Sequence, residues 1–151
     1  MAHDGQYDLM IETPVMKDIL ALTQQAVKPL ETLNTKAINN LRELVTLDNK
    51  VSSSLIETHQ SAAHGVAWLA TYTESIRQMV KWGEKVSKQN KFGQTEQLLL
   101  QIAVSEYLGQ ILGGIMMSQG EIFRLNDIGL TTLDLSLIHI SEPTRLQQIS
   151  Y

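Results

Sequence analysis

The stretch that decides the fold is Glu96–Glu121, which reads EQLLLQIAVSEYLGQILGGIMMSQGE. Apolar and small residues recur in it at steps of three and four, a spacing that puts them on one face of a helix. This face comprises Leu98, Ile102, Ser105, Gly109, Leu112 and Met116, and a stripe beside it comprises Leu99, Ala103, Tyr107 and Ile111. A helix with two apolar stripes packs against two neighbours, as an inner member of a bundle does. Gly113-Gly114 is expected to end the helix, because glycine tolerates the left-handed conformation of a helix terminus.

A second helical pattern precedes this stretch, near the start of the chain. Thr13-Pro14 predicts a helix start, with threonine as the cap and proline at the first helical position. Pro29 is expected to kink or end that helix near Lys28, because proline lacks an N–H and clashes with the preceding turn. The apolar pattern resumes over residues 30–45, and Asp48-Asn49-Lys50 reads as a turn.

A third pattern predicts a long helix from Ser54 to about Lys88. Ser54 and Glu57 have the spacing of a capping box. Two apolar stripes follow: Leu55, Ala62, Val66, Leu69, Ile76 and Val80 form one, and Trp68, Tyr72, Met79, Trp82 and Val86 form the other. Gly93 marks the turn into the helix of the opening stretch. After it, Ser118–Glu121 is expected to cap a short turn through Ile122-Phe123, and residues 126–129 read as loop.

These segments predict an all-α fold, an antiparallel helical bundle of three to four long helices. Each segment carries more apolar surface than a helical hairpin could cover, so we expect the bundle to borrow a further surface from another domain or subunit.

Composition excludes several classes of function. The 151 residues suit one domain, and the formal net charge of −4 gives no basic surface for nucleic acid or anionic lipid. The absence of cysteine rules out disulfides, thiol nucleophiles and thiolate metal sites. The N-terminal residues lack a secretion signal, and no run of about 18 apolar residues predicts a membrane span. A cytoplasmic protein is expected.

No catalytic or metal motif is complete. His59 and His64 are five residues apart on the predicted helix and diverge too far to chelate one metal, and the Glu-x-x-His pairs of a di-iron bundle are missing. Glu106 falls on the predicted inner half of its helix, where it would be either a buried base or a simple bundle-edge pair. The Trp68–Tyr72 step favours core or interface packing over a flavin or base-stacking platform.

Three glycines of the opening stretch need a reason, since glycine inside a helix costs about 1 kcal/mol relative to alanine. One interpretation is a close helix–helix approach at Gly109 and a C-cap at Gly113. The other is that Gly113-Gly114 exposes backbone N–H groups to a phosphate or carboxylate. The residues favour the structural interpretation.

Two parts of the sequence resemble the acyl-CoA dehydrogenases. Gln110-Ile-Leu-Gly113-Gly114-Ile resembles the end of that family's C-terminal helical domain, where a Gln-x-x-Gly-Gly segment lies against the pyrophosphate of the partner subunit's flavin. The run Ala63–Tyr72, with Phe92-Gly93 and Met117–Glu121, resembles the extra N-terminal helical region of some alphaproteobacterial members. The resemblance covers about Ser54 to Leu130.

The resemblance implies an FAD-dependent oxidoreductase that acts on a branched acyl-CoA of the ethylmalonyl-CoA pathway. The full-length enzyme would remove a proton α to the thioester and pass the β-hydrogen as hydride to the flavin. Its downstream catalytic domain is missing here, and a homo-oligomer is expected. Gln110, Gly113 and Gly114 would lie near the flavin. No catalytic residue and no metal ligand is expected in this chain, and the chain alone is not expected to hold FAD.

Residues 1–134 are therefore expected to form the N-terminal helical bundle domain of a longer enzyme, without catalysis of its own. The alternative is a free-standing helical interaction module without a cofactor. From Leu135, the sequence LSLIHISEPTR resembles the in-frame translation of a transposase-type sequencing-library adapter, against the alternative of a short native strand and polar tail. Leu135–Tyr151 is then a non-native tail, and the natural chain continues past about Asp134.

Overall fold

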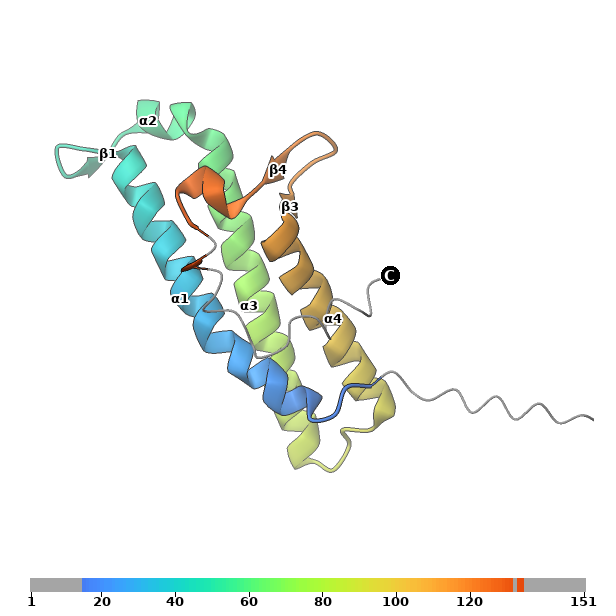
Figure 1. Ribbon diagram of the computed structural model, residues 1–151. Helices are drawn as coiled ribbons and strands as arrows, with labels where there is room; N and C mark the ends of the chain where they lie inside the picture. Colours follow the sequence, from blue (N-terminus) through green and yellow to red (C-terminus); the bar gives the residue numbers. More distant parts are fainter. Residues whose placement is uncertain (1–14, 132, 135–151) are drawn as a thin grey trace, which may run out of the picture.

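The protein folds as an antiparallel bundle of long helices (Figure 1). The computed structural model describes residues 15–131, 133 and 134. In chain order the elements are α1 (Ile19–Val45), β1 (Thr46–Leu47), β2 (Lys50–Val51), α2 (Ser53–Thr58), α3 (Gln60–Lys88), α4 (Gln94–Gly113), β3 (Ile115–Met116), β4 (Ile122–Phe123) and the 3-10 helix η1 (Leu125–Ile128). The predicted all-α bundle is confirmed, and the strands are only two-residue ribbons.

The core lies where α1, α3 and α4 meet. Its largest fully buried side chains include Leu30, Leu33, Leu69, Ile76, Leu100 and Ile111. Burying each such side chain stabilises the fold by about 1.5–3 kcal/mol. Figure 1 shows α3 between α1 and α4, so α3, and not α4 as the double stripe predicted, is the inner helix.

The face of α4 that is buried differs from the predicted one. The buried residues are Leu100, Gln101, Val104, Leu108 and Ile111. Of the predicted stripe, Ile102 and Gly109 are exposed and Leu98 is half-buried. The reason is that α4 has apolar residues on nearly every side. Without a distinct polar face, the periodicity cannot show which side of the helix is buried.

Helix α1 runs through Pro29 instead of ending at Lys28. A proline removes one backbone hydrogen bond, here the one to the carbonyl of Gln25, and Gln25 is exposed, so water can satisfy that oxygen. On either side of the proline, Ala26 and Leu30 are fully buried. Their packing holds the helix together across the break.

The predicted turn at residues 48–50 is the tip of a hairpin. Asp48 and Asn49 have φ values of 50° and 61°, as a two-residue hairpin turn requires. The helix after it begins at Ser53 and is capped by Ser52, whose hydroxyl accepts from the Leu55 N–H at 3.4 Å. The predicted capping box at Ser54 is therefore wrong by two residues.

The long predicted helix is also divided. Helix α2 ends at Thr58, and α3 begins at Gln60 after a junction at His59 with φ −107° and ψ 27°. The predicted end at Lys88 is confirmed. On α3, Val66, Leu69, Ile76 and Val80 of the first stripe are buried, and Trp68, Met79, Trp82 and Val86 of the second are half-buried.

The segment after α4 folds back onto α3. Ser118–Glu121 closes the β3–β4 ribbon, and no helical turn starts there; η1 replaces the predicted loop at residues 126–129. Phe123 lies directly on Gly65: a Cβ on that glycine would come within 2.1 Å of the ring. Asn40 Nδ2 donates to the Ile128 carbonyl at 2.8 Å, which ties η1 to α1.

Helix α1 begins at Ile19, after Asp18 in the left-handed conformation. The predicted helix start at Thr13-Pro14 is wrong, because residues 15–18 are described and are not helical. Thr13 and Pro14 themselves lie outside the described residues, as does the tail Leu135–Tyr151. Met16 precedes the helix, and its backbone N–H donates to the buried Gln101 Oε1 at 2.8 Å. Within the described ranges, none of the helices has the length and apolar character needed to cross a membrane.

Candidate functional site

The residues predicted to lie near a flavin sit at the C-terminal end of α4. Gln110 is half-buried, and its Oε1 accepts from the Tyr72 hydroxyl at 2.7 Å. Gly113 is exposed, and a Cβ placed on it would meet nothing within 4 Å. Gly114 ends the helix with φ 130°, and its N–H donates to the Gln110 carbonyl at 2.8 Å. The structure thus brings the three residues together and leaves Gly113 open to a close approach.

A row of aromatic rings, two on α3 and one on α4, lies beside this helix end. Trp68 and Tyr72 meet edge to face with ring centroids 5.9 Å apart, and Tyr72 lies 4.7 Å from the Tyr107 ring. Burial, together with the neighbouring Tyr107, raises the pKa of Tyr72. The Tyr72 hydroxyl therefore stays protonated and can keep donating to Gln110. The predicted packing role of the Trp68–Tyr72 step fits this arrangement.

The ribbon after α4 is fastened to α3 beside this row. Ser61 Oγ donates to Glu121 Oε1 at 2.5 Å, and His64 Nδ1 lies 4.0 Å from Glu121 Oε2. Trp68 Nε1 donates to His64 Nε2 at 3.0 Å, so the hydrogen of a neutral His64 is assigned to Nδ1, facing Glu121. Sequence reasoning missed this role of Glu121 because its partners lie about 60 residues earlier.

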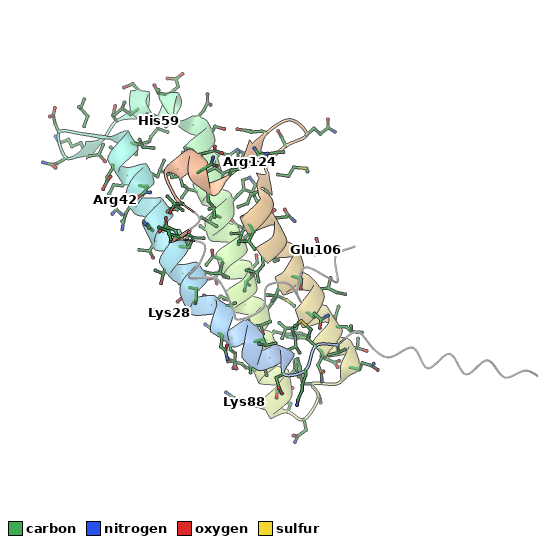
Figure 2. The ribbon with its side chains drawn as sticks, viewed as in Figure 1. Lys28, Arg42, His59, Lys88, Glu106 and Arg124 are labelled. Atoms are coloured by element: carbon green, nitrogen blue, oxygen red, sulfur yellow. The ribbon has the colours of Figure 1, made fainter. Side chains whose placement is uncertain are left out.

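Glu106 lies on the outer side of α4 (Figure 2) and is exposed. The prediction that it falls on the inner half of the helix is wrong, because the whole buried face of α4 is rotated from the predicted one. An exposed carboxylate lacks the desolvation that a buried general base needs. Glu106 is therefore a surface charge on an otherwise apolar face.

The two histidines do not form a pair. His59 sits at the α2–α3 junction, and His64 lies on α3 against Trp68. Among residues 15–131, 133 and 134, no group of three or more histidine, aspartate or glutamate side chains could hold a metal ion.

A polar groove of about 670 Å³ runs between α1 and α3. It is lined by Lys28, Glu31, Lys36, Glu74 and Arg77, among others. Two of its cations already have carboxylate partners: Arg77 donates to Glu74, and Lys36 to Asp134. The Arg77 hydrogen bonds lower the pKa of Glu74 to about 2. The third cation of the lining, Lys28, has no ion-pair partner among the described residues. The groove is thus an open solvent face in which two of the three lining cations are already paired.

Comparison with known proteins gives one informative relative. A 121-residue part of the chain, 80% of its length, is 48% identical to (2S)-methylsuccinyl-CoA dehydrogenase of Cereibacter sphaeroides. The chain resembles (2S)-methylsuccinyl-CoA dehydrogenase. It spans 22% of the length of that dehydrogenase. A scan against models of known protein families finds no match.

The similarity to (2S)-methylsuccinyl-CoA dehydrogenase confirms the resemblance drawn from the residues alone. It extends over more of the chain than the Ser54–Leu130 stretch that carried the motifs. The motifs Gln110–Gly114 and Met117–Glu121 lie at the end of α4 and in the ribbon that folds back onto α3. The assignment of Gln110, Gly113 and Gly114 as residues near a flavin stays a prediction.

Proposed function

We propose that residues 1–134 are the N-terminal helical region of a longer, FAD-dependent acyl-CoA dehydrogenase similar to (2S)-methylsuccinyl-CoA dehydrogenase. In this proposal the whole enzyme introduces a double bond between the α and β carbons of a branched acyl-CoA, in the ethylmalonyl-CoA pathway. The helical region itself carries no catalytic residue. The observation that supports this most strongly is the 48% identity over 121 residues to a protein of which the chain spans only 22%.

Polar side chains of the described part of the chain are engaged within the bundle. The polar groups near the end of α4 bind one another: Tyr72 donates to Gln110, Ser61 donates to Glu121, and Trp68 donates to His64. The α1–α3 groove is open, and two of its three lining cations are already paired with carboxylates.

The end of α4 fits contact with a flavin but not retention of one. Gly113 has open space around its Cα, so a phosphate or ring could approach its backbone closely. The Gln110 Oε1 and the Gly114 N–H already have partners inside the bundle. FAD would supply the hydride acceptor of the reaction. We infer that this chain touches the flavin at most at Gly113, and that the rest of the enzyme holds it.

The proposed contribution of the bundle is positional. Dehydrogenation of a thioester requires the base and the flavin on opposite faces of the Cα–Cβ bond, and small displacements of the substrate are costly. A rigid bundle packed beside the acyl pocket can narrow it toward branched substrates. We propose this pocket-shaping role for the helical region.

Deletion in the relative tests the proposal. In the Cereibacter sphaeroides dehydrogenase, removal of the matched region should lower the ratio of kcat/KM for methylsuccinyl-CoA to kcat/KM for a straight-chain acyl-CoA. Flavin content, read from visible absorbance, should stay close to that of the intact enzyme. An unchanged substrate ratio in a soluble deletion variant would contradict the pocket-shaping role.

A free-standing interaction module is the second candidate, and one observation favours it. The bundle encloses its own core of fully buried residues on α1, α3 and α4, including Leu33, Leu69 and Leu100. The gene beyond codon 134 separates the two candidates. An in-frame catalytic domain supports the dehydrogenase, and a natural stop codon there supports the module.

A further inference from the structure

Helix α4 differs from the other long helices in the charge of its exposed side. Over its 20 residues the only charged side chains are Glu96 and Glu106. The exposed sides of α1 and α3 carry many more, among them Lys28, Lys36, Arg42, Glu74, Lys81 and Lys85. A helix that is apolar nearly all round is typical of one covered on every side. In the described part of the chain, α1 and α3 cover only one side of it.

The uncovered side forms a continuous stripe, which we call the outer face of α4. It consists of Leu99, Ile102, Glu106, Gly109 and Gly113, spaced three and four residues apart and all exposed. Leu99 and Ile102 keep 52% and 53% of their surface exposed. These are large apolar exposures for neighbouring residues on one helix face.

The outer face continues into the β3–β4 ribbon. Met116 and Ile122 are cross-strand partners, 63% and 43% exposed. The Ile122 side chain lies against Gly114, since a Cβ on that glycine would come within 2.7 Å of it. The apolar strip therefore extends beyond the end of α4.

Two glycines on the outer face have no role inside the bundle. A Cβ added at Gly109 or Gly113 would meet nothing within 4 Å, and neither residue has a positive φ. Gly109, inside the helix, costs about 1 kcal/mol relative to alanine. Glycines one turn apart let the backbone of a second helix come close. A close contact with something outside the described residues accounts for both.

The length of the relative indicates which part of the enzyme makes this contact. The matched part is 22% of the Cereibacter sphaeroides dehydrogenase, so most of that polypeptide lies outside it. We propose that the outer face of α4 docks against a helix in the remaining part of the same dehydrogenase polypeptide. The closest approach is at Gly109, one turn before the Gly113 of the proposed flavin contact, and a lysine or arginine of the partner helix pairs with Glu106. The inference rests on the proposed function and adds the docking surface to it.

The charge of the outer face sets the chemistry of its partner. Glu106 is its one charged residue, and within the described ranges no cation pairs with it. A carboxylate placed in an apolar contact is costly unless an opposite charge accompanies it. Reversing this charge should therefore repel the partner without disturbing the bundle itself.

A chimera tests the docking surface in a full-length enzyme. In this chimera, residues 15–134 of the chain replace the matched region of the Cereibacter sphaeroides dehydrogenase. Limited proteolysis then measures the rate at which the helical region is cut free from the rest of the enzyme. Glu106→Lys and Gly109→Leu should each speed that release by about tenfold, because undocking exposes the junction to the protease. Glu31→Lys, in the α1–α3 groove, is the matched control and should release the region at the wild-type rate.

The same variants in the chain alone exclude a folding effect. Glu106 and Gly109 are exposed, so Glu106→Lys and Gly109→Leu should leave the midpoint of thermal unfolding of the isolated chain within a few degrees of wild type. Light scattering on the isolated chain reports any dimer.

Each outcome decides the inference. Equal release rates for Glu106→Lys, Gly109→Leu and the control in an active chimera would overturn the docking surface and leave the proposed function standing. An isolated chain that dimerises through the outer face, and becomes monomeric with Glu106→Lys, would make a second copy the occupant and overturn it too. A chimera that binds no flavin and has no activity, beside an active parent enzyme, would overturn the proposed function and this inference with it.

Discussion

At the scale of single residues, Gly65 shows how a small side chain fixes the position of a distant segment. The Phe123 ring occupies the space that a Cβ would need, with carbons 2.1 Å from it. Phe123 is buried and belongs to the ribbon that follows α4. The glycine thus allows the ribbon to lie flat on α3, which no local pattern around residue 65 could have predicted.

Gly65→Ala should destabilise the chain by about 1–3 kcal/mol, because the methyl group forces Phe123 out of its place. Urea unfolding followed by circular dichroism measures this. Gly109→Ala is the matched control: its Cβ meets open space, so it should raise stability by up to about 1 kcal/mol through helix propensity. Equal effects of the two substitutions would contradict the packing described here.

The Lys36–Asp134 ion pair makes the stability of the fold depend on pH in the acid range. Hydrogen bonds from Lys36 and from the Thr131 backbone lower the pKa of Asp134 from 3.8 to about 2. A carboxyl whose pKa is lower in the folded state contributes stability above its unfolded pKa, and loses it as the pH falls through the folded pKa. The contribution is therefore present above about pH 4 and is lost between about pH 4 and pH 2.

Asp134→Asn should remove that acid-sensitive part of the stability. Urea midpoints measured between pH 2 and pH 6 should change less steeply with pH below about pH 4 in the variant than in wild type. Lys36→Met, which removes the main partner, should flatten the same part of the curve. A wild-type slope in both variants would show that the pair does not act in solution.

At the scale of elements, the helix boundaries show where sequence patterns work. Composition alone identified the turn at residues 48–50 and the end of α3 at Lys88. The cap is Ser52 and not the predicted Ser54. Three serines follow one another at residues 52–54, and the geometry of the preceding hairpin decides which of them caps the helix. Pro29 stays inside α1 because buried neighbours compensate for the lost hydrogen bond, a tertiary effect that the local pattern does not contain.

The choice of cap can be tested with two similar serines. Ser52→Ala should cost about 1 kcal/mol, since it removes the hydroxyl that accepts from the Leu55 N–H. Ser54→Ala lies inside α2 and should change stability by less than about half that amount. Thermal unfolding of both variants distinguishes them. A larger loss for Ser54→Ala would restore the capping box at Ser54.

Pro29→Ala should stabilise α1. Alanine restores an N–H for the Gln25 carbonyl and removes the clash of the proline ring, together about 1–3 kcal/mol. The gain should appear as a higher urea midpoint with an unchanged slope. A loss of stability would show that the bundle needs the bend that a proline imposes.

The buried face of α4 is not the face that its apolar periodicity predicts. Leu98, Leu99 and Leu100 point to different sides of the same helix, so several rotations bury similar apolar area. Contact with α3 and α1 selects Leu100, Val104 and Ile111. Glu106 and Gly109 were placed on the wrong side for the same reason.

At the scale of the whole molecule, the sequence predicted an all-α bundle with more apolar surface than it can cover. The bundle is confirmed, and the exposed Leu99, Ile102 and Met116 agree with the uncovered surface. The residues of the candidate site could be named from a short motif. Their hydrogen bonds could not, because Tyr72 and Gln110 come from different helices 38 residues apart.

The central claim is that the outer face of α4 is covered in the intact enzyme. Because the chain has no cysteine, Ile102→Cys introduces a single thiol on that face, and Thr71→Cys, exposed on α3, serves as the control. Maleimide labelling, read by mass spectrometry of the peptide that carries each thiol, compares the isolated chain with the full-length chimera. We predict that Ile102→Cys reacts about tenfold more slowly in the chimera while Thr71→Cys reacts at the same rate in both. Equal labelling of Ile102→Cys in the isolated chain and in an active chimera would contradict the account.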